Sequence, residues 1–176
     1  ILDGSELSDV FLKTYRIIAF PIANPDGVDL GHWRHNYGGI DLNRDWSVYN
    51  QPEIKQIVRF INNASEDDEG DIILGLDFHS TTKDVFYTNK KRENTSMPNF
   101  IDYWFAGLER NIPGYKVNES SGNSQEPVSK GWFLYGHNAV GVTYEIGDAT
   151  PKEDIVIRGQ VSAKEMMKIL VYIIKP

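Results

Sequence analysis

The chain has 176 residues, of which 40% are hydrophobic, and this length and composition suffice for one folded domain. It has no cysteine, which excludes disulfide bonds and thiolate metal sites. Its net charge of −7 argues against nucleic-acid binding, which usually needs a basic surface, and no apolar run is long enough for a transmembrane helix. The first residue is Ile rather than Met, so we expect a chain cut out of something longer, whose start indicates no compartment.

The first predicted elements are a strand, a long loop and a helix. Residues 15–20 (YRIIAF) form a short apolar run that ends at Pro21, and the NPDG sequence at residues 24–27 predicts a turn. A loop follows, and a helix then begins at Pro52 and Glu53, with apolar residues at the i, i+3, i+4 and i+7 positions Ile54, Ile57, Val58 and Ile61. We expect the acidic residues 66–69 to form a solvated loop.

In the second half of the chain, strands and helices continue to alternate. Residues 72–78 (IILGLDF) predict a central strand buried on both faces, with residues 79–82 at its carboxyl end, where ligand sites gather in α/β sheets. The later elements are a strand at 85–88, a helix at 100–108, a polar binding loop at 113–130 and a strand at 139–146. Ser162 and Glu165 predict the capping box of a last helix, with the apolar face Met166, Met167, Leu170, Ile173 and Ile174. This order predicts an α/β fold with a mixed, mostly parallel central sheet flanked by helices.

Two residues at predicted strand ends are candidates for chemistry. A lone histidine such as His79 is more often structural than a metal ligand, and the other histidines form no local ligand pair with it. A carboxylate such as Glu145, near the end of an apolar strand, loses hydration, which raises its pKa toward that of a general base. From its position alone, Glu145 could equally be a surface residue.

Arg34, Asn43 and Arg44 lie together in the predicted loop. An arginine offers a planar set of donors that matches a carboxylate or an oxyanion, and an asparagine can add a further hydrogen bond to the same carboxylate. Salt bridges to Asp29, Asp41 or Asp45 are an equally good interpretation of the two arginines.

Taken in order, these residues resemble the zinc metallocarboxypeptidase family, of the carboxypeptidase A/B type. The matching motifs extend over nearly the whole chain: residues 24–27 (NPDG), 33–34 (WR), 39–44 (GIDLNR), 51–53 (QPE), 77–80 (DFHS) and 143–146 (TYEI). The resemblance implies a carboxypeptidase-like phosphorylase/hydrolase fold without its N-terminal part. It also implies one catalytic Zn²⁺ and a peptide or N-acyl amino acid substrate with a free carboxylate.

The resemblance also implies a role for each candidate residue. His79 would be the third protein ligand of the zinc, and Glu145 the general base that activates the zinc-bound water. Arg34 would polarise the scissile carbonyl and stabilise the oxyanion. Asn43 and Arg44 would hold the substrate's terminal carboxylate, and Asp41 would orient another zinc ligand.

The sequence departs from the family's pattern in two places. The family's first two zinc ligands come from a His-x-x-Glu motif upstream of NPDG, and this chain contains no such motif. We therefore expect a truncated catalytic domain rather than a degenerate relative, with very poor zinc affinity. The family's substrate-closing tyrosine would fall on Asn123, while Tyr115 and Tyr135 are off register, so no closing tyrosine is assigned.

By the same ungapped count, Lys130 falls near the position that selects the substrate's terminal side chain. We expect it to favour an acidic residue, unless it simply faces solvent. The predicted function is zinc-dependent hydrolysis of an amide bond next to a C-terminal carboxylate, with this chain alone inactive. A deacylase or amidase acting on N-acyl amino acids or cell-wall peptides, and a non-catalytic carboxylate-binding module, are the alternatives.

Overall fold

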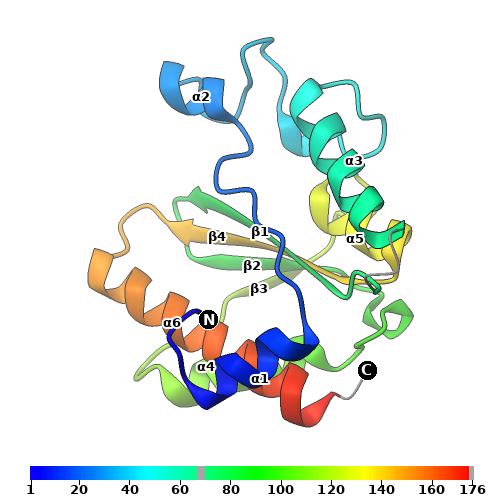
Figure 1. Cartoon of the computed structure of the whole chain (residues 1–176). Coiled ribbons are helices and arrows are strands. Elements are labelled where there is room, and N and C mark those ends of the chain that lie inside the picture. The colour runs from blue at the N-terminus through cyan, green and yellow to red at the C-terminus, as the bar shows by residue number, and fades with distance from the viewer. Residues whose placement is uncertain (67–69, 175–176) are drawn as a thin grey trace.

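The computed structural model describes residues 1–66 and 70–174, and its centre is a four-stranded mixed sheet with helices on both faces (Figure 1). The strand order is β1 (Leu74–Thr81), β4 (Val140–Gly147), β2 (Val85–Thr88) and β3 (Glu119–Ser121). β1 is parallel to β4, β4 is antiparallel to β2, and β2 is parallel to β3. The predicted α/β class with a mixed, mostly parallel sheet is therefore confirmed.

The larger core lies on the sheet face covered by α1 (Glu6–Thr14), α4 (Phe100–Asn111) and α6 (Lys152–Lys168), which continues into a π-helical turn at Ile169–Ile173 (Figure 1). Aromatic rings dominate this core. Phe86 of β2 stacks on Tyr144 of β4 with ring centroids 4.1 Å apart, and the ring of Trp104 in α4 packs edge-on against Phe86. Such pairs add about 0.5–1.5 kcal/mol each to the free energy gained by burying the rings.

The other face of the sheet carries α3 (Pro52–Glu66) and α5 (Ser129–His137), with the short helices α2 (Pro25–Leu30), η1 (Leu42–Arg44) and η2 (Arg92–Asn94) in the connections. The predicted apolar stripe of α3 is confirmed, because all of its members are buried: Ile54, Ile57, Val58 and Ile61. They pack with Leu42 and with Trp132 of α5. This smaller core therefore attaches the predicted loop to the sheet.

A partly buried polar cluster around Asp84 ties β4 and α6 to the segments that precede β2 and β3. Oδ1 of Asp84 accepts a hydrogen bond from the Tyr115 hydroxyl at 2.7 Å, and Oδ2 accepts one from the Tyr144 hydroxyl at 2.8 Å. Nη1 of Arg158 in α6 also donates to Oδ2. Burial, together with the hydrogen bond to Asp84, raises the pKa of Tyr144 to about 12, so its hydroxyl stays a donor at neutral pH.

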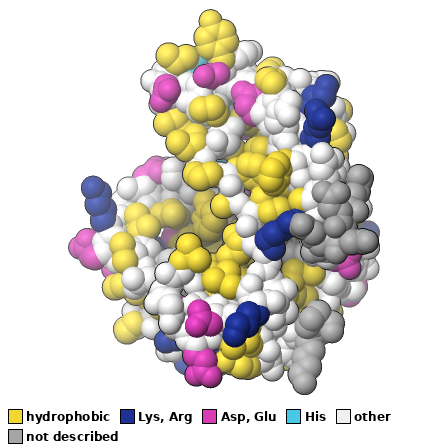
Figure 2. All heavy atoms as spheres, in the orientation of Figure 1, with side chains coloured by type: hydrophobic (Ala, Val, Ile, Leu, Met, Phe, Trp, Pro, Cys, Tyr) yellow, Lys and Arg dark blue, Asp and Glu magenta, His cyan; other side chains and the backbone are white. Residues whose placement is uncertain are grey.

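The predicted strand at residues 15–20 is wrong. This segment is extended but pairs with no strand among the described residues, and it crosses in front of β1 on the way from α1 to α2 (Figure 1). Strand propensity produces a sheet only where a neighbouring strand completes the hydrogen bonds. Apolar side chains are consequently exposed here, and Figure 2 shows yellow side chains gathered on this face; the exposed ones nearby in sequence are Ile17, Ile18, Phe20 and Ile22.

The predicted strand at residues 72–78 is correct in kind but not in position. β1 lies at the edge of the sheet, since in the described part of the chain only β4 pairs with it. Phe78 is 65% exposed, so the prediction of burial on both faces is wrong. His79 lies inside β1 rather than after it, because the strand continues to Thr81.

The predicted capping box of the last helix is also wrong. α6 begins at Lys152, ten residues before Ser162, directly after Pro151 and with Glu153 and Asp154 in its first turn, where carboxylates favour the helix dipole. Ser162 uses its backbone carbonyl to accept from Nε1 of Trp104. On the predicted apolar face, Met166, Met167 and Leu170 are buried, Ile174 is partly buried, and Ile173, at the end of the π-helical turn, is exposed.

The remaining predictions concern the other strands and helix, the loops and membrane spans. The 85–88, 100–108 and 139–146 elements are confirmed as β2, α4 and β4. The polar stretch at 113–130 is mostly irregular, but it contains β3 and ends in the first turn of α5. Apart from residue 66, which ends α3, the acidic run lies outside the described residues. None of the described helices combines the length and apolarity that a membrane crossing requires.

We expect the open edge of β1 to cause concentration-dependent self-association, because its unpaired backbone groups can pair with another chain. The substitution Phe78→Lys should reduce this association, since a charged side chain on an edge strand opposes pairing with another chain. Analytical ultracentrifugation over a range of concentrations would measure it. The matched control is Tyr172→Lys, an equally exposed aromatic position outside the sheet. A wild-type chain that stays monomeric at high concentration would contradict the prediction.

Candidate active site

Many polar residues of the long loop hold the loop itself. Asn24 accepts from the backbone N–H of Gly27 and donates to the carbonyl of His35, both at 3.1 Å. A Cβ at Gly27 would lie 2.6 Å from that carbonyl oxygen, so only glycine fits there. Buried Asp45 accepts from the N–H groups of Asn50 and Gln51 at 3.0 and 2.8 Å, which shapes the entry to α3. Asn24 and Asp45 therefore stabilise the loop itself. The loop's other polar residues, Arg34, Asn43 and Arg44, remain candidates for binding.

The Asn43 side chain is fixed in one orientation. Its Oδ1 accepts a hydrogen bond from the backbone N–H of Ser129 at 2.9 Å. Because a backbone N–H can only donate, the oxygen of the amide faces Ser129, and the amide's NH₂ group is turned toward other partners. Asn43 is therefore presented as a donor, as the binding of a carboxylate requires.

Arg34 and Arg44 converge on Asp41. Oδ2 of Asp41 lies 3.7 Å from Nη1 of Arg34 and 3.9 Å from Nη1 of Arg44, and both arginine side chains are about half exposed. Oδ1 of Asp41 accepts from the backbone N–H of Asn43 at 2.9 Å. Both ion pairs are longer than a hydrogen bond. Asp41 therefore holds the two guanidinium groups near each other without using up their N–H donors. Salt bridging to Asp41 and a binding role are thus compatible.

His79 and Glu145 are direct partners in the parallel register of β1 and β4. Nε2 of His79 donates to Oδ2 of Asp77 at 2.8 Å, and the Ser129 hydroxyl donates to the same oxygen at 2.5 Å. Asp77 was not among the predicted site residues, although its spacing of two from His79 places both on one face of a strand. No sequence signal marks Ser129.

The charges of this cluster act on one another. Burial raises the pKa of Glu145, as do the negative charges of Asp77 and Asp148, while His79 and Arg34 lower it. For His79, burial lowers the pKa, but the hydrogen bond to Asp77 and the surrounding carboxylates reverse this, so the pKa is raised. The structure thus brings His79, Glu145 and Arg34 within electrostatic range, from three separate segments of the chain.

Lys130 is buried, with 3% of its surface exposed, so the alternative of a solvent-facing lysine is wrong. Its ammonium donates to the carbonyl of Thr88 at 3.2 Å and to that of Gly122. Within the described residues, no carboxylate forms an ion pair with it. Burial therefore lowers the pKa of Lys130 from 10.5 to about 8.

This burial predicts a pH-dependent stability. Below pH 8 the lysine is protonated in both folded and unfolded chains, so the cost of a buried charge is fully present. Between pH 8 and 10.5 the folded chain loses the proton first, and the free energy of unfolding should rise, by about 3 kcal/mol for a shift of this size. Lys130→Met removes the titrating group, and urea unfolding of both chains from pH 7 to 10.5 isolates its effect. A constant difference between them would contradict the prediction.

The described residues do not form a complete metal site. Across residues 1–66 and 70–174 there is no group of three or more His, Cys, Asp or Glu that could hold a metal ion. His32 and His35 have a His-x-x-His spacing, but they too belong to no such group. His79 alone does not fit a zinc ion, which normally takes three protein ligands in a catalytic site. Tyr115 is bound to Asp84, so it is not free to close over a substrate.

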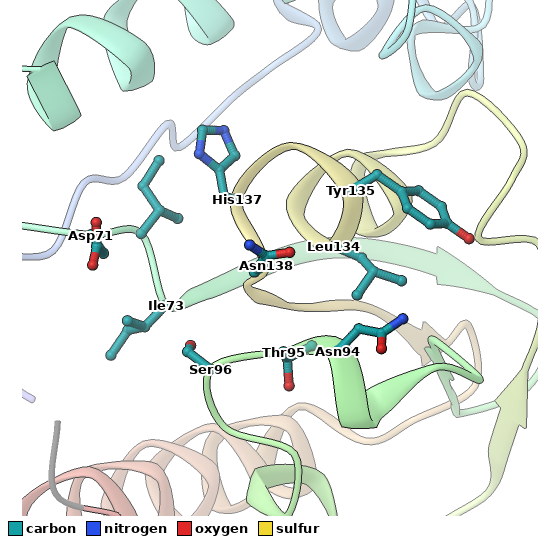
Figure 3. A pocket seen from close by; sticks show the side chains of 10 residues that line it. Asp71, Ile73, Asn94, Thr95, Ser96, Leu134, Tyr135, His137 and Asn138 are labelled. Atoms are coloured by element: carbon teal, nitrogen blue, oxygen red, sulfur yellow. The ribbon is translucent and has the colours of Figure 1, made fainter.

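A cavity of about 700 Å³ lies apart from these residues. It is lined by residues at the amino ends of β1 and β4 and by the end of α5, and Figure 3 shows Asp71, Ser96, His137 and Asn138 around it. Tyr135 also lines it, so this second tyrosine is remote from His79. His79 lies six positions after Ile73, or about 20 Å along the strand. The cavity is thus at the opposite end of the sheet from the cluster.

The fold is that of an α/β protein, with His79, Glu145 and Arg34 brought together at one end of β1 and β4. The chain belongs to the zinc carboxypeptidase family, whose model matches residues 5–162. A Plasmodium falciparum (isolate 3D7) protein named "Putative zinc carboxypeptidase" is 35% identical over 86 residues, which are 47% of this chain and 5% of that protein.

Solved structures share the fold at low identity. The "Putative carboxypeptidase A" of Shewanella denitrificans superposes with a TM-score of 0.60 at 20% identity, covering 84% of this chain and 44% of that one. A metallo-carboxypeptidase of Pseudomonas aeruginosa, in complex with (2-guanidinoethylmercapto)succinic acid, has a TM-score of 0.54 at 17% identity, covering 84% and 43%. This chain thus spans less than half the length of these two structures.

Proposed function

We propose that this chain carries the substrate-binding and proton-transfer part of a metallocarboxypeptidase site, which cleaves an amide bond next to a free C-terminal carboxylate. The observation that carries the proposal is the fixed amide of Asn43, whose NH₂ group remains a donor, in the same loop as Arg34 and Arg44, which both lie near Asp41. Glu145 adds a carboxylate whose pKa is raised by burial. The hydrogen bond from the Ser129 N–H leaves the Asn43 NH₂ group as a donor, and the raised pKa of Glu145 suits a group that takes up a proton.

Each side chain has a distinct task in this reaction. Asn43 and Arg44 bind the substrate's terminal carboxylate, which places the preceding amide bond near Arg34. Arg34 donates to the carbonyl oxygen and stabilises the negative charge that develops there. Glu145 takes a proton from the attacking water and delivers it to the leaving nitrogen. Asp41 holds the two arginines together and fixes the backbone at Asn43.

The metal would need ligands beyond the described residues, because His79 alone does not hold zinc. We accordingly expect this chain by itself to show no appreciable hydrolysis. A second candidate function is a module that binds C-terminal carboxylates without cleaving them, which agrees with the lack of a three-residue metal site within residues 1–66 and 70–174. A deacylase or amidase would keep the same carboxylate clamp, formed by Asn43 and Arg44, and assays with N-acyl amino acids in place of peptides would distinguish it.

Lys130 supports a preference for an acidic terminal side chain. Its ammonium has three donors, and the carbonyls of Thr88 and Gly122 take two of them. A substrate carboxylate could accept the third and neutralise a buried charge that has no ion-pair partner among the described residues.

The experiment measures the hydrolysis of peptides ending in Glu, Leu and Lys. Each peptide is tested with two proteins, the isolated chain and a longer protein that contains this chain and binds zinc. We expect zinc-dependent release of the terminal residue only from the longer protein, fastest for Glu, and loss of the preference in Lys130→Met. Binding without cleavage by a zinc-loaded longer protein would support the non-catalytic module. Equal rates for all three peptides would remove the role of Lys130.

A further inference from the structure

A continuous series of hydrogen bonds connects Asn43 in the loop with His79 in β1. Oδ1 of Asn43 accepts from the backbone N–H of Ser129, the Ser129 hydroxyl donates to Oδ2 of Asp77, and Nε2 of His79 donates to the same oxygen. The three distances are 2.9, 2.5 and 2.8 Å. Ser129, at the centre, is 1% exposed, so little water competes with its bonds.

The donors and acceptors in this series have fixed directions. An ionised carboxylate can only accept, so both the Ser129 hydroxyl and Nε2 of His79 carry the hydrogens they share with Asp77. Nδ1 of a neutral His79 ring is then the nitrogen with a free lone pair. The side chain of Asp77 therefore sets the tautomer of His79, and Ser129 sets the position of the Asp77 carboxylate.

We propose that Asp77 and Ser129 are positioning residues that couple occupation of the carboxylate clamp at Asn43 to the state of the His79 imidazole. The coupling rests on the proposed function, because the clamp's ligand is taken to be a carboxylate. Ser129 is the joint: its backbone N–H holds Asn43 and its hydroxyl holds Asp77, so a ligand that moves the Asn43 amide displaces both bonds. Bonds to a charged carboxylate are short and strong, which suits the transmission of small shifts.

The first test needs no ligand and no metal. Two-bond ¹H–¹⁵N correlation spectra of the histidine rings report which nitrogen of His79 carries the hydrogen. In the wild-type chain we expect the Nε2–H form, and in Asp77→Ala a mixture of the two tautomers. Ser129→Ala should keep the Nε2–H form but shift its ring resonances, since Asp77 loses its other donor. Ser80→Ala, a neighbouring serine whose exposed side chain makes no hydrogen bond with a described residue, is the matched control.

The second test measures the coupling. N-acetyl-L-alanine carries the free carboxylate, and N-acetyl-L-alanine amide is its neutral counterpart. We expect the acid, and not the amide, to shift both the Asn43 side-chain NH₂ and the His79 ring resonances of the wild-type chain. In Ser129→Ala the Asn43 shift should remain, because the backbone N–H is kept, while the His79 shift is lost. Ser80→Ala should behave as the wild type.

The outcomes separate this proposal from the proposed function. A His79 tautomer unchanged by Asp77→Ala, or a ligand-induced His79 shift undiminished in Ser129→Ala, would overturn the positioning role. No response of Asn43 to the acid would instead overturn the carboxylate clamp and with it the coupling, whatever the tautomer of His79.

Discussion

Replacing Glu145 with glutamine is expected to lower amide hydrolysis by a zinc-loaded longer protein about 10²- to 10⁴-fold, with little change in substrate affinity. Glutamine keeps the size and polarity of the side chain but cannot accept the proton of the attacking water. The loss should therefore fall on kcat rather than on KM. Steady-state kinetics with a peptide ending in Glu would measure it.

Glu126→Gln is the control for this substitution, because Glu126 is exposed in the loop before α5 and lies outside the cluster. The control should leave both kinetic constants within about twofold of the wild type. If Glu145→Gln retained most of the activity, another group would have to be the base. A rise in KM alone would assign Glu145 to substrate binding instead.

Removal of the Asp84 carboxylate should produce the largest loss of stability, about 3–5 kcal/mol in the free energy of unfolding for Asp84→Ala. The substitution leaves Arg158 mostly buried without its ion-pair partner and deprives two tyrosine hydroxyls of their acceptor. Urea denaturation followed by circular dichroism would give the value. Asp84→Asn should cost less, since the amide oxygen can still accept one of the three hydrogen bonds.

The matched control for Asp84 is Asp102→Ala, which removes a carboxylate paired with Arg92 on the surface. Asp102 is 69% exposed, so its pair is worth about 0–1 kcal/mol. Equal losses for the two alanine variants would show that burial does not set the strength of the Asp84 cluster.

The elements of the fold that have a clear local sequence pattern could be predicted. The 3.6-residue period of α3 and the apolar runs of β2 and β4 predict elements that the structure confirms, because these segments bury a continuous stripe or strand. The segment at 15–20 has an equally strong strand composition, yet it forms no ladder. A strand needs a partner, and the chain's own composition does not reveal whether one is present.

The site was predictable from side-chain chemistry only in part. Arg34, Asn43 and Arg44 stand out because their donors fit a carboxylate, and the structure brings Arg34 and Arg44 to Asp41 and connects Asn43 to Asp77 and His79 through Ser129. Asp77 and Ser129 did not stand out, because their part in the cluster depends on contacts between segments distant in sequence. The burial of Lys130 likewise results from the packing of α5 on the sheet, which no local pattern indicates.

The pairing of β1 with β4 also has a consequence for the order of folding. His79 and Glu145 are direct partners although they lie 66 positions apart in the sequence. Closing so long a loop is entropically unfavourable, and structures dominated by distant contacts fold slowly. In a chain synthesised from its N-terminus, the arginine loop and His79 emerge well before Glu145. Glu145 can therefore join His79 and Arg34 only after β4, the last strand of the sheet, is in place, and a partly folded chain lacks this charged cluster.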